Sequence, residues 1–171
     1  MKLPLRPSRL TVRRQTIKWI ILHHTSEIYK QPAAKIDNST FQTVDLIKGV
    51  LEDKSADINY HYIIEKIKDD FYPIVARPFP YLCEWDDIDD NINNRALHVA
   101  VLGNYDIVVP EKRMYEILAY KVLNPFIKMY HIPVDHIKFH NEVSSNEDIT
   151  CPGDFMDQGR VISLVRRFVV K

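Results

Sequence analysis

The sequence predicts a single α/β domain in which helices flank a mixed central β-sheet. The 171 residues suffice for one domain with a substantial core, and the 46% hydrophobic and 27% charged residues are ordinary values for a globular protein. Short β-branched runs of strand length alternate along the chain with longer segments of helical periodicity. That alternation is typical of folds in which a sheet packs against helices.

Composition excludes several classes of partner. The 23 basic and 23 acidic residues cancel, so the overall charge does not indicate a nucleic-acid partner. No segment approaches the ~18 consecutive apolar residues of a transmembrane helix. The basic N-terminal residues are not followed by the uninterrupted apolar stretch of an ordinary signal peptide. We expect a monomer that is cytoplasmic as synthesised and does not insert into membranes.

The N-terminal residues and the cysteines are interpreted simply. Residues 1–15 carry two prolines and five cations without clear periodicity, so we interpret them as an arm or short edge element, most simply a solvated tail. The folded domain is then expected to span residues 16–171. Cys83 and Cys151 are expected to stay reduced, because an intracellular chain with a core this size needs no disulfide.

The first predicted strand ends in two histidines. Residues 17–22 form a β-branched apolar run of strand length, bounded by His23, His24 and two hydroxyl residues. Because side chains alternate across a strand, His23 and His24 should point to opposite faces. At most one of them can therefore face a given pocket.

A helix and a β-hairpin are predicted next. Residues 39–42 have capping-box spacing, and a helical stripe of apolar residues continues to about residue 54. Residues 59–65 and 71–77 combine aromatic and β-branched residues on either side of a charged turn, which is typical of a hairpin.

Alternation along the first hairpin strand separates its side chains into two sets. Tyr60, Tyr62 and Ile64 are expected on one face of the sheet. His61 and Ile63 are expected on the other. On this pattern Tyr60 and His61 should not serve the same site.

The second half of the chain continues the pattern. A long loop rich in proline and acidic residues is predicted over residues 78–94; its acidic run lacks the glycine and terminal glutamate of an EF-hand and is interpreted as a solvated turn. The elements expected after it are a buried strand at 96–103, a helix from 110 to a break near Asn124-Pro125 that resumes at 126–130, a short edge strand at 134–139, and a closing helix over 155–168 that packs on the sheet.

Potential metal ligands gather in two places. One is the loop from His140 to Gly153, which contains Cys151, and the other is the strand end at His23 and His24. Taken singly, a cysteine before Pro-Gly is more often a small buried hydrophobe than a ligand. Two histidines and a cysteine together are a set that zinc prefers, and they leave a fourth tetrahedral position for water, as in catalytic zinc sites. The combination predicts a zinc hydrolase.

Four blocks of sequence occur in the order found in a known family. They are Ile20-Ile21-Leu22-His23-His24-Thr25, Asn59-Tyr60-His61-Tyr62-Ile63-Ile64, Val99-Ala100-Val101-Leu102-Gly103-Asn104, and His140-Asn141-Glu142-Val143 with Thr150-Cys151-Pro152-Gly153. With these blocks the chain resembles the zinc-dependent N-acetylmuramoyl-L-alanine amidases, which include phage lysozyme amidases and peptidoglycan recognition proteins. The resemblance spans most of the chain. It implies that family's fold, with residues 16–171 as the amidase-like catalytic domain.

The resemblance also implies the site and the reaction. It selects His23, His140 and Cys151 as the zinc ligands, with His24 as the alternative to His23, and Tyr60 as an active-site residue that orients a water or hydrogen-bonds to the developing oxyanion. The implied reaction is hydrolysis of the amide between the lactyl group of N-acetylmuramic acid and L-alanine by a zinc-activated water. The implied partner is peptidoglycan or a free muropeptide. A phage-type lysin released to the cell wall, or a cytosolic recycling amidase, would fit.

Three positions complicate this assignment. Many family members carry lysine or threonine two residues before the third ligand, where this chain has Ile149, which cannot donate a hydrogen bond to an oxyanion. The segment from Tyr81 to Trp85 stands where the family often has a histidine-alanine segment lining the substrate groove, so the substrate-binding residues are unknown. Glu142 is a candidate base or ligand-orienting group, or simply a surface salt-bridge partner.

Two other functions remain open. A recognition module would hold the stem peptide without cleaving it; Ile149 favours this alternative, whereas Cys151 disfavours it because a pure binder needs no third zinc ligand. A structural zinc domain would need a fourth protein ligand, such as His61 or Asp154. Metal removal would unfold that domain rather than only silence it.

Overall fold

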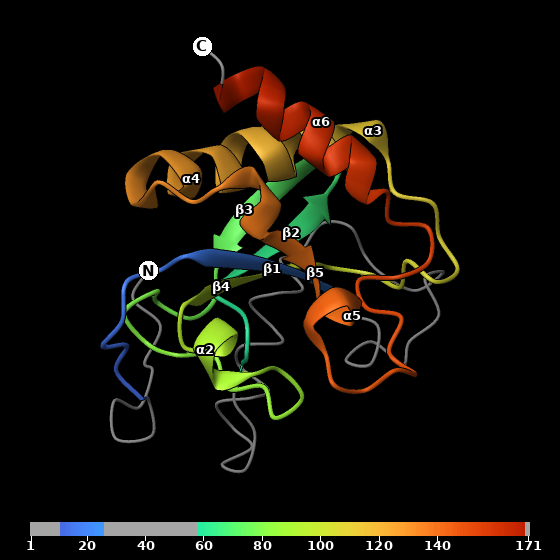
Figure 1. The fold of residues 1–171 in the computed structure, drawn as a ribbon. Helices are drawn as coiled ribbons and strands as arrows, with labels where there is room; N and C mark the ends of the chain where they lie inside the picture. The colour runs from blue at the N-terminus through green and yellow to red at the C-terminus, as the bar shows by residue number, and fades with distance from the viewer. Residues whose placement is uncertain (1–10, 26–57, 170–171) are drawn as a thin grey trace.

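A five-stranded mixed β-sheet forms the centre of the protein. The computed structural model describes residues 11–25 and 58–169 (Figure 1). The strands are β1 (Trp19–His24), β2 (Tyr62–Ile67), β3 (Asp70–Val75), β4 (Ala96–Val101) and β5 (Ile137–Phe139), in the spatial order β3-β2-β4-β1-β5. β1 pairs in parallel with β4 and β5, and β2 pairs in parallel with β4 and antiparallel with β3. The predicted α/β domain with a mixed sheet is confirmed, and so is the hairpin.

One face of the sheet is covered by the longer helices. These are α3 (Lys112–Ile117), α4 (Asn124–Tyr130) and α6 (Gln158–Val169), whereas the one-turn helices α2 (Asp90–Asn93) and α5 (His140–Val143) lie on the opposite side (Figure 1). Leu22, Leu97 and Val99 from the sheet share the main apolar cluster with helix residues such as Leu118 and Val165. This apolar layer supplies most of the described core.

The predicted break at Asn124-Pro125 is wrong. α3 continues through a π-helical segment (Leu118–Leu123) directly into α4. The N–H of Asn124 donates to the carbonyl of Ala119, five residues earlier, so the hydrogen-bond register has shifted just before Pro125. Pro125 has no N–H to donate and takes an early position in α4. The π-helical segment therefore lets the chain continue as a helix through a proline.

A row of histidines lies on the face opposite the long helices. His23 is the register partner of Ala100, and His98 is the partner of Ile21. Because register partners share a face and every second residue returns to it, His23 and His98 lie on the same face. His140 follows β5 at the corresponding edge of the sheet, beside β1. The strands thus place buried imidazoles from distant parts of the chain side by side.

Tyr60 lies on this histidine face, which corrects the predicted alternation. Strand β2 begins only at Tyr62, after a bend at His61. Because strand alternation does not extend back to Tyr60, its ring packs in the cluster of Ile63 and Ala100 rather than with Tyr62 and Ile64.

The N-terminal segment is attached to the body of the protein. Val12 forms a β-bridge with Tyr81, and the Arg13 guanidinium donates to the carbonyls of Phe79, Asn94 and Ala96 at 2.8–3.1 Å. The interpretation of Arg13 as part of a solvated tail is therefore wrong. The boundary between an arm and a domain at residue 15 stays a prediction.

Three further expectations concern two helices and the cysteines. The predicted helix over residues 39–54 lies outside the described residues. The predicted closing helix exists, but α6 runs from Gln158 to Val169 and packs mainly against the α3–α4 helical segment rather than directly on the sheet. Cys83 and Cys151 are both buried and form no disulfide with one another.

Candidate metal centre

The structure brings His23, His140 and Cys151 together. One ligand atom from each lies within 4.8 Å of the other two, and all three side chains are buried. The Nδ1 atom of His23 is 3.7 Å from the Sγ atom of Cys151. Zinc–nitrogen and zinc–sulfur bonds of about 2.0 and 2.3 Å at a tetrahedral angle place those two atoms about 3.5 Å apart. The donor set and its spacing therefore fit a zinc ion.

Neighbouring parallel strands and one loop create this arrangement. His23 lies near the end of β1, and His140 opens α5 directly after β5, which pairs with β1. The loop that carries Cys151 is tied to α5, because the Asn141 N–H donates to the Cys151 carbonyl at 2.9 Å. The backbone N–H of His24 also points at the Cys151 sulfur, at 3.4 Å. That contact favours a thiolate, the form that binds metals.

His24 points away from the cluster, as strand alternation predicts. Its Nδ1 accepts a hydrogen bond from the Tyr105 N–H at 3.2 Å, and its Nε2 lies 3.9 Å from Asp106. Of the two histidines, only His23 belongs to the cluster among the described residues.

Each histidine of the cluster has a partner behind it. The Nε2 atom of His23 is 2.9 Å from Nδ1 of His98. The Nε2 atom of His140 is 2.9 Å from a carboxylate oxygen of Asp87, although neither ring nitrogen of His140 has a partner in good hydrogen-bond geometry. Buried imidazole nitrogens without such a partner are an independent sign that a ligand belongs there. In both residues a side-chain atom lies 2.9 Å from Nε2, so Nδ1 is the atom that we expect to face a metal.

Burial keeps these imidazoles neutral. It lowers the pKa of His23 well below its usual value, and the neighbouring His98 and His140 lower it further. Burial also lowers the pKa of His140, against the opposing effect of the Asp87 carboxylate. Neutral imidazole is the form that coordinates a metal.

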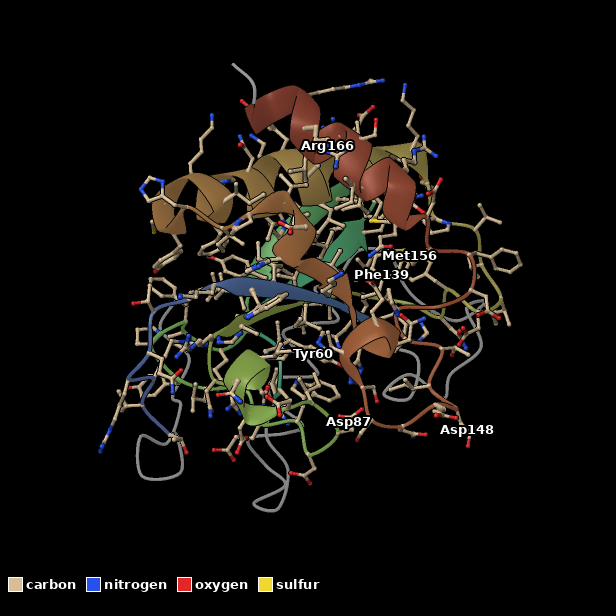
Figure 2. The ribbon with its side chains drawn as sticks, in the orientation of Figure 1. Tyr60, Asp87, Phe139, Asp148, Met156 and Arg166 are labelled. Atoms are coloured by element: carbon tan, nitrogen blue, oxygen red, sulfur yellow. The ribbon has the colours of Figure 1, made fainter. Side chains whose placement is uncertain are left out.

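Aromatic side chains line the cluster. The Trp85 ring stacks on His23 with centroids 4.5 Å apart and meets His140 edge-on at 4.8 Å. The Tyr60 ring packs edge-on against His23 at 5.4 Å, and its hydroxyl donates to the His24 carbonyl at 3.4 Å. Figure 2 shows Tyr60 and Asp87 on the side of the sheet opposite α6. The predicted active-site tyrosine is thus next to the candidate ligands.

Other candidate residues lie outside the cluster. The Glu142 carboxylate accepts from the Phe139 N–H at 2.6 Å and pairs with Lys138 at 3.5 Å, so it caps α5 rather than contacting a ligand. His61, buried, contacts the Tyr81 carbonyl and the Cys83 thiol. Within residues 11–25 and 58–169, neither His61 nor Asp154 joins the three-residue group as a fourth ligand.

The sequence interpretation missed His98 and Asp87. His98 lies inside an apolar strand, and Asp87 lies in the acidic run that was interpreted as a solvated turn. The signal that could have found His98 is the register of β1 on β4, which no local pattern contains.

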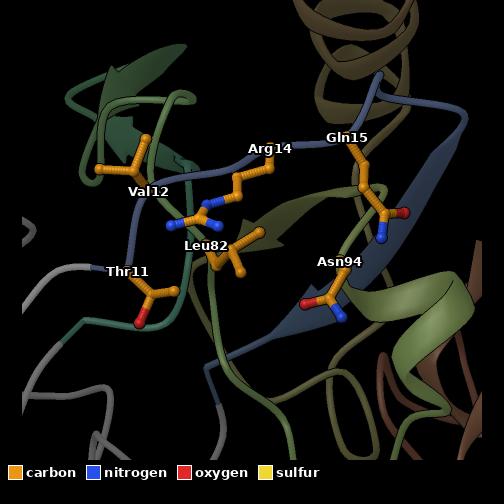
Figure 3. Close-up of a pocket in the computed structure, with 6 residues that line it drawn as sticks. All are labelled: Thr11, Val12, Arg14, Gln15, Leu82 and Asn94. Atoms are coloured by element: carbon orange, nitrogen blue, oxygen red, sulfur yellow. The ribbon is translucent and has the colours of Figure 1, made fainter.

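A pocket of about 490 Å³ lies elsewhere, between the N-terminal segment and the loop before β4 (Figure 3). Its lining residues are Thr11, Val12, Arg14, Gln15, Leu82 and Asn94. None of the candidate ligands lines it, so it is separate from the candidate metal centre.

Sequence comparison identifies the family. The profile of the N-acetylmuramoyl-L-alanine amidases matches residues 13–154. The chain belongs to this amidase family. No curated protein sequence matches significantly.

Solved structures share the amidase-family fold at low sequence identity. The N-acetylmuramoyl-L-alanine amidase LysC from Clostridium intestinale has a TM-score of 0.62 and 18% identity, over 88% of this chain and 86% of that one. The endolysin of Thermus scotoductus bacteriophage Ph2119 has a TM-score of 0.57 and 20% identity, over 91% and 89%. Bumblebee peptidoglycan recognition protein SA has a TM-score of 0.65 and 13% identity, over 92% and 87%. At such identities the likeness establishes the fold alone.

The described part of the chain contains no helix with the length and apolarity needed to cross a membrane.

Proposed function

We propose that this member of the amidase family is a zinc-dependent hydrolase of the amide bond between the N-acetylmuramoyl group and L-alanine in peptidoglycan or muropeptides. The observation that carries the proposal is the buried cluster of His23, His140 and Cys151, whose spacing suits a tetrahedral ion. Family membership supplies the substrate class.

In this proposal the three ligands have distinct supports. His23 and His140 bind through Nδ1, because their Nε2 atoms face His98 and Asp87. Cys151 binds as a thiolate, which the His24 N–H stabilises. With three protein ligands, a bound zinc ion would keep a position for water and lower its pKa to about 7.

Tyr60 is proposed as the residue that contacts the reacting groups. It packs against His23, and its hydroxyl is held at the His24 carbonyl, so a short rotation would present the O–H to a developing oxyanion. Trp85 lines the same site, and its ring shields the rings of His23 and His140 from water.

The second candidate function is recognition of muropeptide without cleavage. Ile149 is the observation that favours it, because this half-buried apolar side chain stands where many family members place a hydrogen-bond donor. Loss of one such donor typically costs about 10²- to 10³-fold in rate. The third ligand, Cys151, favours the enzyme.

The test is release of L-alanine-headed stem peptides from purified peptidoglycan by the zinc-loaded protein. We expect cleavage by the parent and by Cys83→Ala, which removes the other buried thiol, and none by Cys151→Ala. Parallel assays on intact sacculi and on free muropeptides distinguish a wall lysin from a recycling enzyme. Binding of muropeptide without cleavage by the parent would establish the recognition module instead, and unfolding on metal removal alone would indicate a structural zinc.

A further inference from the structure

The side chain behind His23 is a second buried imidazole, that of His98. His23 Nε2 and His98 Nδ1 lie 2.9 Å apart, and both residues are fully buried. Water therefore cannot replace either partner. In neutral imidazoles one ring nitrogen donates and the other accepts, so a proton sits on only one of these two facing atoms.

Asn93 determines which atom that is. One terminal atom of its amide lies 3.1 Å from the Cys83 carbonyl oxygen and 3.0 Å from Nε2 of His98, and the other lies 3.1 Å from the Trp85 N–H. An amide nitrogen in the first position and an oxygen in the second satisfy both backbone groups. In that orientation Asn93 donates to Nε2 of His98.

The orientation of Asn93 fixes the tautomer of His98 and, through it, that of the candidate ligand His23. Since Nε2 of His98 accepts, its Nδ1 carries the proton and donates to Nε2 of His23. The His23 proton then lies on Nδ1, the atom that faces the Cys151 sulfur. Metal coordination requires a lone pair on that same Nδ1.

We propose that Asn93 and His98 form a positioning relay behind His23, in which metal binding at Nδ1 of His23 reverses the tautomers of both histidines and rotates the Asn93 amide. His23 then donates from Nε2 to His98, and His98 donates from its own Nε2 to the Asn93 oxygen. Each ring carries one proton before and after. The Nδ1 proton of His23 leaves to solvent, the Nδ1 proton of His98 moves to Nε2 of His23 across the 2.9 Å contact, and a proton from solvent is taken up on Nε2 of His98. The inference rests on the metal centre proposed above.

Rotation of the amide has a cost, so Asn93 opposes metal binding. After the turn, the Asn93 oxygen faces the Cys83 carbonyl oxygen and its NH₂ group faces the Trp85 N–H. The hydrogen bonds to the Cys83 carbonyl and the Trp85 N–H are lost, and the NH₂ group gains only a long one to the Trp85 carbonyl, at 3.4 Å. An acceptor-only side chain at this position would hold His98, and through it His23, in the tautomers that bind metal.

The direct test is long-range ¹H–¹⁵N correlation NMR on the full chain with ¹⁵N-labelled histidine, treated with chelator and then saturated with zinc. We expect His98 and His23 to be protonated at Nδ1 without metal and at Nε2 with zinc. If zinc binds and the His98 tautomer stays the same, the relay is wrong while the metal centre stands. If no zinc binds at His23, both are wrong.

Variants supply a second readout, the zinc dissociation constant from competition with a chelating dye. Asn93→Asp should tighten binding about 5- to 10-fold, because a carboxylate only accepts hydrogen bonds. Asn94→Asp is the matched control: it adds the same charge at the next residue, whose side chain lines the separate pocket of Figure 3. Equal effects of the two, or weaker binding by Asn93→Asp, would overturn the relay.

Position 98 distinguishes positioning from packing. His98→Leu should weaken zinc binding about 10- to 100-fold, the usual effect of losing a partner of a metal-binding histidine. His98→Asn keeps a polar atom at the place of Nδ1 and should recover most of that loss. Urea unfolding of each variant checks that it is folded, and equal weakening by Leu and Asn would contradict the proposal.

Discussion

Asp87 supports the candidate metal centre from the side of His140, and its effect can be measured alone. Its carboxylate lies 2.9 Å from Nε2 of His140 and also accepts from the Ser144 hydroxyl at 2.6 Å. A carboxylate behind a ligand histidine orients the ring and raises its basicity. We expect Asp87→Asn to weaken zinc binding by about 10-fold or more, measured by chelator competition. Asp86→Asn, at an exposed neighbour, should bind zinc like the parent.

Trp85 can report on metal binding at the candidate metal centre. The chain has two tryptophans, Trp85 stacked 4.5 Å from the His23 ring and Trp19 at the opposite end of β1. In Trp19→Phe, cobalt added in place of zinc should quench most of the remaining fluorescence, because the metal binds beside the emitting ring. In Trp85→Phe the signal from Trp19, about 13 Å or more along the strand from His23, should change far less. Equal quenching in both variants would place the metal elsewhere.

At the level of single residues, the sequence singles out the three candidate ligands that the structure brings together, but not the side chains behind them. His23, His140 and Cys151 combine a metal-ligand residue type with a family motif. His98 and Asp87 match no motif, and their positions depend on strand register and on how a long loop folds back. Those are tertiary facts, and the acidic run around Asp87 has the composition of an ordinary solvated turn.

Among the elements, the loop after α5 depends on one glycine. Gly153 has a φ of +107°, and a Cβ atom there would lie 2.4 Å from the Tyr105 carbonyl carbon. Because backbone cannot move aside cheaply, Gly153→Ala should destabilise the fold by at least about 2 kcal/mol and weaken zinc binding through Cys151. Urea unfolding and chelator competition measure the two effects.

The matched control for Gly153 lies in α6. Gly159 is exposed in the first turn, and an added Cβ would meet only the Asp157 side chain, at 3.3 Å. We expect Gly159→Ala to stabilise the protein by about 0.4–1 kcal/mol. If both substitutions have the same sign, close packing of the Cys151 loop on Tyr105 is not what the glycine provides.

Elements were predictable where local patterns decide them. β1, β4 and the hairpin follow from β-branched and alternating runs. The errors fall where a non-local or unusual feature decides: the π-helical segment before Pro125, and the bend at His61 that puts Tyr60 beside His23. The rule that proline ends a helix does not hold where a π-helical segment comes before it, and the alternation of side chains along a strand does not extend back past the bend to Tyr60.

On the scale of the whole molecule, the sheet separates two tasks. Its helix-covered face carries the apolar core, and its other face carries buried histidines from β1, from β4 and from the bend just before β2. Burial removes these imidazoles from water and disfavours their charged form, so protonating them would destabilise the folded state. The buried histidines of this face therefore make the free energy of unfolding of the whole protein depend on pH.

This link predicts acid destabilisation above the range in which carboxylates titrate. Burial lowers the pKa of His61 to about 3 and that of His98 well below its usual value. Between about pH 6.5 and 3 the unfolded chain binds more protons at His61 than the folded one, so the free energy of unfolding falls as pH drops. His61 alone should contribute roughly 1 kcal/mol per pH unit in that window, and its contribution is fully present above pH 6.5.

Urea unfolding at pH 7.5, 6 and 5 in the presence of a chelator measures this dependence without contributions from metal. His61→Asn keeps an acceptor at the position of Nδ1, where the His98 N–H donates at 2.9 Å, but cannot take up a proton. Its stability should fall less steeply between pH 7.5 and 5 than that of the parent. His131→Asn, at an exposed helix end, should keep the parent's slope. Equal slopes for the parent and His61→Asn would mean that burial of His61 is not what couples this fold to pH.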